Sequence, residues 1–181
     1  FHEEYPDISM EIFQGTYDDV VYWIKNGVVD VGFLSVSSAA DIPIEPLYKD
    51  PLLCVVQKGH RTSKEPMSIE EMKNCQFVTQ RESTDADIQN FMKENHLDVR
   101  SSYHVVDDLS TVVMVANGFG ICLMPEMVMK DIPYEVDCFP VKPDACRIIG
   151  IAALNPDNMA PAVRTFYNRV LAMYQQEEYV K

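Results

Sequence analysis

The stretch that decides the fold class is residues 9–34, SMEIFQGTYDDVVYWIKNGVVDVGFL. Its first four residues alternate between polar and apolar side chains, a pattern that predicts a strand over residues 9–13. Gly15 permits a turn, and the Thr16 hydroxyl can accept a hydrogen bond from an N–H group of the following helix. Residues 29–34 form a second strand, after apolar side chains at helical spacing at Val20, Val21, Ile24 and Val28. A strand, a helix and a strand joined by short loops predict a parallel α/β sheet.

The same order of elements recurs over residues 76–106. Residues 76–79 form a short apolar strand, and the polar residues 80–85 follow as a loop. Residues 102–106 return as a strand after a helix with apolar side chains at Ile88, Phe91 and Met92. A second α/β unit therefore follows the first.

The rest of the chain predicts additional strands and a closing helix. Residues 52–56 are a continuous apolar run suited to a buried strand, and Ser68 begins a Ser-x-x-Glu capping box. Late strands are expected over residues 136–139 and 147–154, before a final helix over residues 159–174. These late elements can return to complete the first lobe.

Two successive α/β units predict a protein with two lobes and two chain crossings between them. We expect the crossings near Cys75 and Pro140. On these boundaries residues 1–74 and 141–181 form lobe I, and residues 75–140 form lobe II. A ligand cleft is expected between the lobes.

The composition predicts a globular protein that does not bind nucleic acid by itself. Its 181 residues are 47% hydrophobic, which is enough for a core and argues against disorder. The formal net charge is −13, and DNA phosphates repel such a surface. No apolar run approaches about 18 residues, and the first residues lack the basic start of a signal peptide. We expect a cytoplasmic protein with no membrane segment.

Metal, cofactor and nucleophile motifs are not evident. The five cysteines are odd in number and show no Cys-x-x-Cys spacing, so a zinc site or a disulfide framework is not favoured. Gly118-Phe119-Gly120 lacks the third glycine of a dinucleotide loop and lies at the end of a predicted helix. No general base lies beside Ser83 or Ser110 in the sequence. We expect no metal, no cofactor and no enzymatic activity.

Several short motifs follow one another along the chain. They are Phe1-x-x-x-Tyr5-Pro6-x-Ile8 with Gln14-Gly15-Thr16, Gly27-x-x-Asp30-Val31-Gly32-Phe33, Pro46-Leu47-Tyr48-Lys49-Asp50-x-Leu52 with Gly59-His60, and Val115-x-x-Gly118-Phe119-Gly120-Ile121-x-x-x-Pro125. Taken together and in this order, they resemble the effector-binding domain of LysR-type transcriptional regulators. The resemblance extends over most of the chain.

The resemblance implies the type II periplasmic-binding-protein-like α/β fold, with two Rossmann-like lobes joined by two crossover segments. It implies a dimerisation domain that binds a small-molecule effector between its lobes and assembles as a homodimer or tetramer. Family members contact promoter DNA through an N-terminal winged helix-turn-helix. That domain, and the family's first strand, are expected to precede Phe1.

The candidate effector contacts of lobe I lie at two chain positions. Gly15 and Thr16 form the helix-entry turn, where backbone N–H groups and the helix dipole favour an anion. In the family, the threonine after this glycine often contacts a ligand carboxylate, and a plain helix cap explains the same residue. Phe33, Leu34 and Ser35 lie at the end of a strand, where α/β clefts open.

The corresponding turn of lobe II follows the strand that begins at residue 76. Its candidates for neutral hydrogen bonds are Thr79, Gln80, Ser83 and Thr84. Arg81 can pair with a carboxylate through two parallel bonds, although a surface arginine beside Glu82 is the simpler interpretation. Val106 can form a wall or part of a hinge. These groups predict a small carboxylate or another anion as the effector.

Three other functions remain open from the sequence. One is an extracytoplasmic solute-binding protein of the same fold. Another is an enzyme such as a prephenate dehydratase, whose Thr-Arg-Phe motif is only scrambled in Thr79-Gln80-Arg81 and Arg164-Thr165-Phe166. The third is a peroxide sensor, but the two cysteines of that branch would fall at about residues 80–91, where this chain has none.

Overall fold

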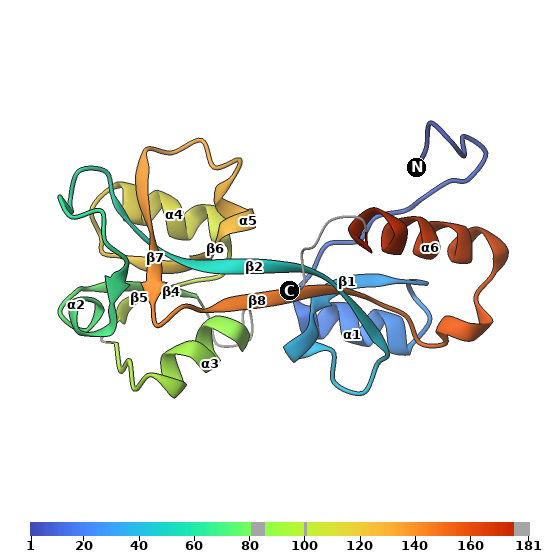
Figure 1. Cartoon of the computed structure of the whole chain (residues 1–181), viewed down its shortest axis with the longest axis horizontal. Coiled ribbons are helices and arrows are strands. Elements are labelled where there is room, and N and C mark those ends of the chain that lie inside the picture. Colours follow the sequence, from blue (N-terminus) through green and yellow to red (C-terminus); the bar gives the residue numbers. More distant parts are fainter. Residues whose placement is uncertain (81–85, 100, 176–181) are drawn as a thin grey trace. The chain divides into compact units, whose positions relative to one another are not determined.

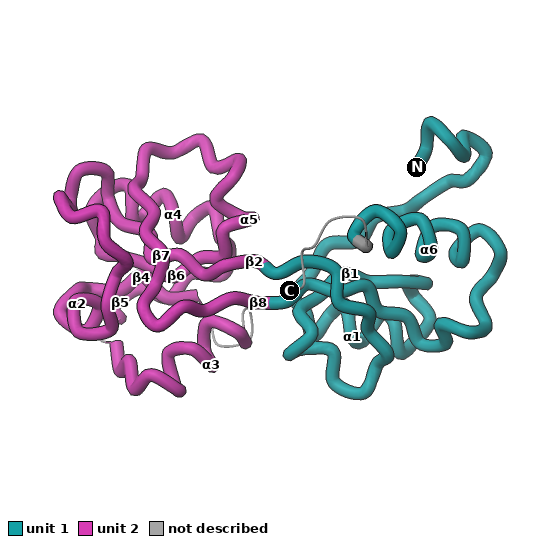
Figure 2. The backbone as a smooth tube through the Cα atoms, in the orientation of Figure 1, with its two compact units in different colours: residues 1–49, 148–181 teal, residues 50–147 magenta. Residues whose placement is uncertain are grey.

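The protein consists of two compact units, which Figure 2 shows in different colours. Unit 1 comprises residues 1–49 and 148–181, and unit 2 comprises residues 50–147. Two strands, β2 (Ile44–Gln57) and β8 (Cys146–Ala152), carry the chain from one unit to the other. The computed structural model describes residues 1–80, 86–99 and 101–175.

Unit 1 contains two helices on opposite faces of its strands (Figure 1). Its elements, besides parts of β2 and β8, are α1 (Tyr17–Lys25), β1 (Gly32–Ser35), a 3-10 turn (Val36–Ser38), a second 3-10 turn (Pro156–Asn158) and α6 (Pro161–Gln175). On one face, Ile24 of α1 packs in a cluster with Leu34 and Ala152. On the other face, Tyr167 of α6 packs in a cluster with Ile151. Successive residues of β8 therefore supply both cores, as strand alternation requires.

Unit 2 has a mixed set of strands with helices on both faces. Its elements, besides parts of β2 and β8, are β3 (Met67–Ser68), α2 (Ile69–Lys73), β4 (Phe77–Gln80), α3 (Ala86–Glu94), β5 (Ser101–Val105), α4 (Asp108–Ala116), β6 (Cys122–Pro125), α5 (Glu126–Met129) and β7 (Val136–Lys142). β2 pairs antiparallel with β6 and β7, β3 pairs parallel with β7, and β4 pairs parallel with β5. The predicted second α/β unit is thus confirmed as β4, α3 and β5.

The two faces of unit 2 bury different helices. Ile88 and Phe91 of α3 pack in one cluster with Phe77 and Leu123. Val112 and Val115 of α4 pack in the other with Val78, Cys122 and Met124. Neighbouring residues of β4 and β6 again point to opposite faces, so that α3 and α4 each cover one side of the same strands.

Helix starts and ends agree with the sequence predictions. Thr16 and Ser68 are N-caps with complete capping boxes, and Asp107 caps α4. Gly27 (φ +66°) and Gly118 (φ +80°) follow the ends of α1 and α4 in the left-handed region. Most of the predicted loop over residues 80–85, which precedes α3, lies outside the described residues.

The unit boundaries differ from those predicted near Cys75 and Pro140. The chain crosses at residues 49 and 50 and again at residues 147 and 148. The reason is the pairing of residues 52–57, which hydrogen-bond with β6 and β7 and so belong to unit 2. A strand's partners are not visible in its own sequence.

The first predicted strand, residues 9–13, was wrong. These residues have no strand geometry, and the Ile12 side chain is 89% exposed. β1, which we expected in a parallel sheet, pairs antiparallel with residues 149–152 of β8. Alternation alone does not make a strand, because a strand needs a neighbour to receive its backbone hydrogen bonds.

The five cysteines are free thiols. Cys54 and Cys122 are fully buried on opposite faces of the paired strands β2 and β6, and burial raises the pKa of both thiols. Cys138 is exposed. Among the described residues, no helix is both long and apolar enough to cross a membrane.

Candidate functional site

The carboxyl ends of β4 and β5, which carry several polar side chains, lie at one edge of unit 2. β4 and β5 run parallel, with Thr79 paired to His104 and Gln80 paired to Val105. Their carboxyl ends therefore lie at the same edge, where α/β proteins commonly bind ligands. α4 begins there at Asp108, directly after β5. We call this set of strand ends and the start of α4 the carboxyl edge of unit 2.

The start of α4 is held by the chain's own side chains. Asp107 accepts a hydrogen bond from the Ser110 N–H (2.8 Å), and the Thr111 hydroxyl donates to the Asp107 carbonyl oxygen (2.8 Å). The bonds from Ser110 lower the pKa of the Asp107 carboxyl group, because they stabilise its charged form. Asp107 is therefore the N-cap of α4.

Thr79 and Gln80 are tied to the neighbouring elements. The Gln80 amide donates to a carboxylate oxygen of Asp108. The Thr79 hydroxyl donates to the Tyr103 carbonyl oxygen (3.3 Å) and lies 3.0 Å from Nδ1 of His104. A hydroxyl has only one proton, so when the Thr79 hydroxyl donates to Tyr103, its oxygen can only accept from Nδ1–H of His104.

His104 and Asp108 were not among the predicted site residues. Local sequence patterns do not link either residue to Thr79 or Gln80, because the partners lie 25 and 28 positions apart. The signal that could have found His104 is strand register. Once β4 and β5 are known to pair in parallel, Thr79 and His104 become direct neighbours.

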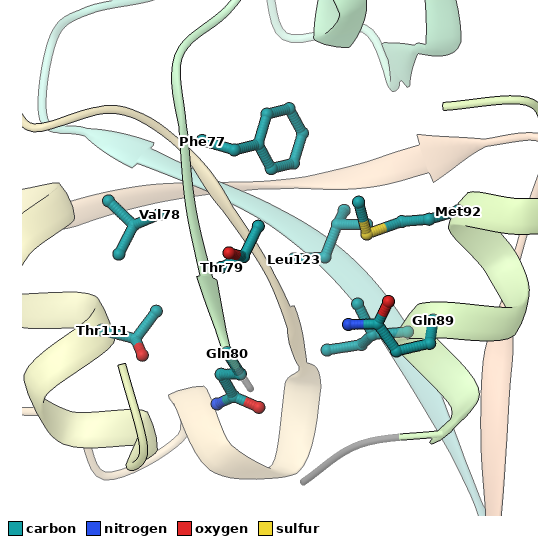
Figure 3. Close-up of a pocket in the computed structure, with 9 residues that line it drawn as sticks. Phe77, Val78, Thr79, Gln80, Gln89, Met92, Thr111 and Leu123 are labelled. Atoms are coloured by element: carbon teal, nitrogen blue, oxygen red, sulfur yellow. The ribbon is translucent and has the colours of Figure 1, made fainter. Parts of the chain in front are cut away.

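A small pocket extends from this edge into the core of unit 2 (Figure 3). Figure 3 shows Thr111 of α4 and Gln89 of α3 on opposite sides of β4, with Gln80 at the end of this strand. Its remaining lining is mostly apolar, with Phe77, Val78, Ile88, Met92 and Leu123. The enclosed space has room for about one water molecule. It can seat a water or a single substituent, so a whole metabolite would have to lie outside it.

The helix-entry turn of unit 1 already holds a carboxylate. Asp19 accepts hydrogen bonds from the Thr16 N–H (2.9 Å) and the Thr16 hydroxyl (2.8 Å), and the Asp19 N–H donates to that hydroxyl (3.2 Å). These bonds lower the pKa of Asp19. At Gly15 a Cβ would lie 2.6 Å from the Trp23 ring, so the turn packs closely against α1. A ligand anion at Thr16 would compete with Asp19.

The strand-end candidates of unit 1 differ in access. Phe33 is 45% exposed and stacks edge-on against Phe166, with ring centroids 6.4 Å apart. Leu34 and Ser35 are fully buried, and the Ser35 and Ser37 hydroxyls lie 3.1 Å apart. Of the three strand-end residues, Phe33 is thus the one whose side chain reaches solvent.

The predicted site residues fall into three groups. Thr79, Gln80 and the exposed Val106 belong to the carboxyl edge of unit 2. Unit 1 holds Gly15, Thr16, Phe33, Leu34 and Ser35. Outside the described residues lie Arg81, Ser83 and Thr84. Within the described part of the chain, no three His, Cys, Asp or Glu side chains are grouped to hold a metal ion.

A comparison with models of protein families identifies the family of this chain. The family model described as the LysR substrate binding domain matches residues 1–175. The chain belongs to the LysR substrate-binding domain family. This confirms the resemblance found in the sequence motifs.

Relatives of this LysR substrate-binding domain are named as transcriptional regulators. The probable HTH-type transcriptional regulator LrrA of Synechococcus elongatus is 23% identical over 168 residues, covering 92% of this chain and 57% of the relative. The chain therefore spans little more than half the length of that relative.

Two solved structures share the fold of this chain. The CcmR regulatory domain of Synechocystis PCC6803 in complex with 2-PG has a TM-score of 0.87 at 16% identity, covering 97% of this chain and 88% of that one. The QuiR effector-binding domain in complex with shikimate has a TM-score of 0.83 at 23% identity, covering 97% and 86%. The expected type II periplasmic-binding-protein-like fold of this LysR substrate-binding domain is thereby confirmed.

Proposed function

We propose that this domain senses a small-molecule effector and that the carboxyl edge of unit 2 contributes to its recognition. The observation that carries the proposal is the grouping of Thr79, Gln80 and His104 at adjacent parallel strand ends. Hydroxyl, amide and imidazole groups at such an edge are the polar contacts that orient small ligands in α/β proteins.

The effector we propose is a small hydroxylated carboxylate or another small anion. Hydrogen-bonding groups such as the Gln80 amide and the His104 imidazole suit hydroxyl groups. The solved relatives were bound to 2-PG and to shikimate, and shikimate is a hydroxylated carboxylate. Because Asp19 already holds the Thr16 turn, an anion there would displace a carboxylate that this chain supplies itself.

The whole protein, we propose, is a cytoplasmic transcriptional regulator that acts as a homodimer or tetramer. Promoter DNA would be contacted by a domain outside this chain, since a net charge of −13 opposes binding to phosphates. Effector binding would shift the balance between conformations of this domain and so change the presentation of the DNA-binding domains. Neither enzymatic activity nor a resident cofactor is part of the proposal.

A thermal-shift screen tests effector recognition. The isolated domain is heated with a panel of metabolites that includes 2-PG and shikimate, and hits are titrated by calorimetry. A true effector raises the melting temperature with increasing concentration, because it binds the folded state only. The proposal fails if no member of a broad panel of anionic and hydroxylated metabolites stabilises the domain.

Two glutamine variants test the position of the site. Gln80 donates to Asp108 at the start of α4, and Gln57 donates to the Ala116 carbonyl oxygen at its end (3.2 Å). Gln80→Leu should weaken effector binding about tenfold, the effect of losing one polar contact. Gln57→Leu, which removes a comparable bond at the opposite end of the same helix, should leave the affinity unchanged. Equal losses of affinity in both variants would show that the carboxyl edge of unit 2 makes no specific contribution to effector binding.

A further inference from the structure

A fully buried carboxylate lies where the chain enters unit 2. Asp50 is the first residue of unit 2 and Arg147 is the last, and they lie in β2 and β8, the strands that carry the chain between the units. The Asp50 side chain is 0% exposed, and that of Arg147 is 11% exposed. Charges are costly to bury, so a buried pair at this place in the chain requires an explanation.

Both oxygens of the Asp50 carboxylate accept hydrogen bonds. Oδ2 accepts from Nε–H of Arg147 at 2.9 Å, and Oδ1 accepts from the backbone N–H of Met127 at 2.8 Å. One carboxylate thus joins β2, β8 and the first turn of α5. These bonds are charge-assisted and directional, which an apolar contact of the same size would not be.

Asp50 also replaces a missing helix cap. The N-cap position of α5 is Pro125, which makes no side-chain hydrogen bond to the helix. The Met127 N–H is one of the groups that a helix start leaves without a partner inside the helix. Asp50 satisfies it from a residue 77 positions earlier in the chain. α5 is therefore anchored to the connecting strands by the same carboxylate that binds Arg147.

The neighbouring backbone strengthens this arrangement on the side of unit 2. Leu52 N–H donates to the Ala145 carbonyl oxygen at 2.9 Å, and residues 52–55 pair with β6, which leads directly into α5. β8 is also a hydrogen-bonded neighbour of β2 in the sheet. The ends of the two connecting strands that lie in unit 2 are therefore held together at more than one point.

We propose that Asp50 and Arg147 form a hinge clasp. The clasp joins the ends of both connecting strands to α5 as one rigid part of unit 2. Any bending of one unit against the other is then confined to the bonds just outside the clasp, near Lys49 and Ile148. Asp50 and Arg147 are positioning residues in this proposal, which does not depend on the identity or existence of an effector.

Single and double substitutions separate the positioning role from simple stability. Asp50→Leu and Arg147→Met each remove one member of the buried ion pair, and each should lower the melting temperature by about 10 °C. The double variant D50L/R147M replaces the pair with apolar groups and should regain most of that loss, because such replacements are often neutral. It cannot restore the directional bonds.

The decisive readouts are measured on the double variant. Hydrogen–deuterium exchange at the Met127 backbone N–H should become about tenfold faster, because this group loses its hydrogen bond to Asp50. Spin labels at the exposed positions Asp30 of unit 1 and Lys64 of unit 2 should report a broader distance distribution than in the wild type. The labels are attached through noncanonical residues, so the native cysteines are untouched.

The outcomes separate the alternatives. A stable double variant with faster Met127 exchange and a broader distribution supports the clasp. A stable double variant in which the Met127 exchange rate and the width of the distance distribution are both those of the wild type shows that the pair only fills space. That result overturns the clasp. If the double variant does not recover stability, D50N/R147Q replaces it, which should keep a neutral hydrogen-bonded pair and the wild-type width. A broader distribution in D50N/R147Q at wild-type Met127 exchange would also refute the clasp.

Discussion

Residues 9–35 and 77–105 show similar patterns in the sequence but fold differently. In the second stretch, β4 and β5 pair in parallel around α3, and Ile88 and Phe91 are buried beneath the helix. In the first stretch, α1 forms as predicted, but residues 9–13 are not a strand, and β1 pairs antiparallel with β8. The comparison shows that a helix and its cap are local properties, whereas a strand depends on its partner.

Core truncation on the two helices should have the largest effect. Phe91→Ala on α3 should lower the free energy of unfolding by about 4 kcal/mol, and Ile24→Ala on α1 by about 3 kcal/mol, since both side chains are buried. Amide hydrogen exchange should show each loss first within its own unit. If Ile24→Ala increased amide hydrogen exchange in β4 and β5 as much as in β1, the two units would unfold together. The two units would then not differ in their stability.

Alanine substitutions at two glycines test how tightly the backbone is packed in each unit. At Gly120 (φ +145°) a Cβ would lie 2.4 Å from the backbone oxygen of Gln76, which cannot move independently of β4. Gly120→Ala should therefore cost about 3 kcal/mol. At Gly32 the added Cβ meets only side-chain atoms of Val20 and Ile24, which can shift, so Gly32→Ala should cost about 1–2 kcal/mol. Urea unfolding checks both, and a reversed order would refute the argument.

The helix caps should have smaller and nearly equal effects. Thr16→Ala in unit 1 and Asp107→Ala in unit 2 each remove a side-chain acceptor from a helix start and should cost about 1 kcal/mol. Circular dichroism during urea unfolding measures both. A much larger loss in either variant would mean that the residue does more than cap its helix.

The pH dependence distinguishes Asp107 from a neutral cap. Its folded pKa is lowered, chiefly by the bonds from Ser110, so its charged form stabilises the fold fully above the unfolded pKa of about 4. That stabilisation is lost as the pH falls through the lower folded pKa. Asp107→Asn should therefore be less stable than the wild type at pH 7, and the difference should shrink in acid. A difference that is constant with pH would exclude the carboxylate as its source.

Features that depend on a few neighbouring residues were predictable. Thr16, Ser68 and Asp107 cap their helices, and Gly27 and Gly118 adopt positive φ after helix ends. Each of these depends on residues within about four positions, which the sequence displays directly. The family motifs, read in order, also led to the correct family.

Features that depend on distant residues were not predictable. The crossings were misplaced because residues 52–57 pair with strands that lie about 65–90 positions later in the chain. The contact of Thr79 with His104 depends on strand register, and that of Asp50 with Arg147 joins residues 97 positions apart. Local patterns carry no information about such partners, so these two contacts became visible only in the folded chain.

The native cysteines of unit 2 can be used to measure how often its core opens, without any engineered label. A thiol-reactive reagent should label Cys138 quickly in the native protein, because that residue is exposed. Cys54 and Cys122 are 0% and 1% exposed and lie in the cores covered by α3 and α4, so they react only when those cores open. Mass spectrometry that counts adducts over time would therefore record the opening rate of unit 2 without any engineered probe.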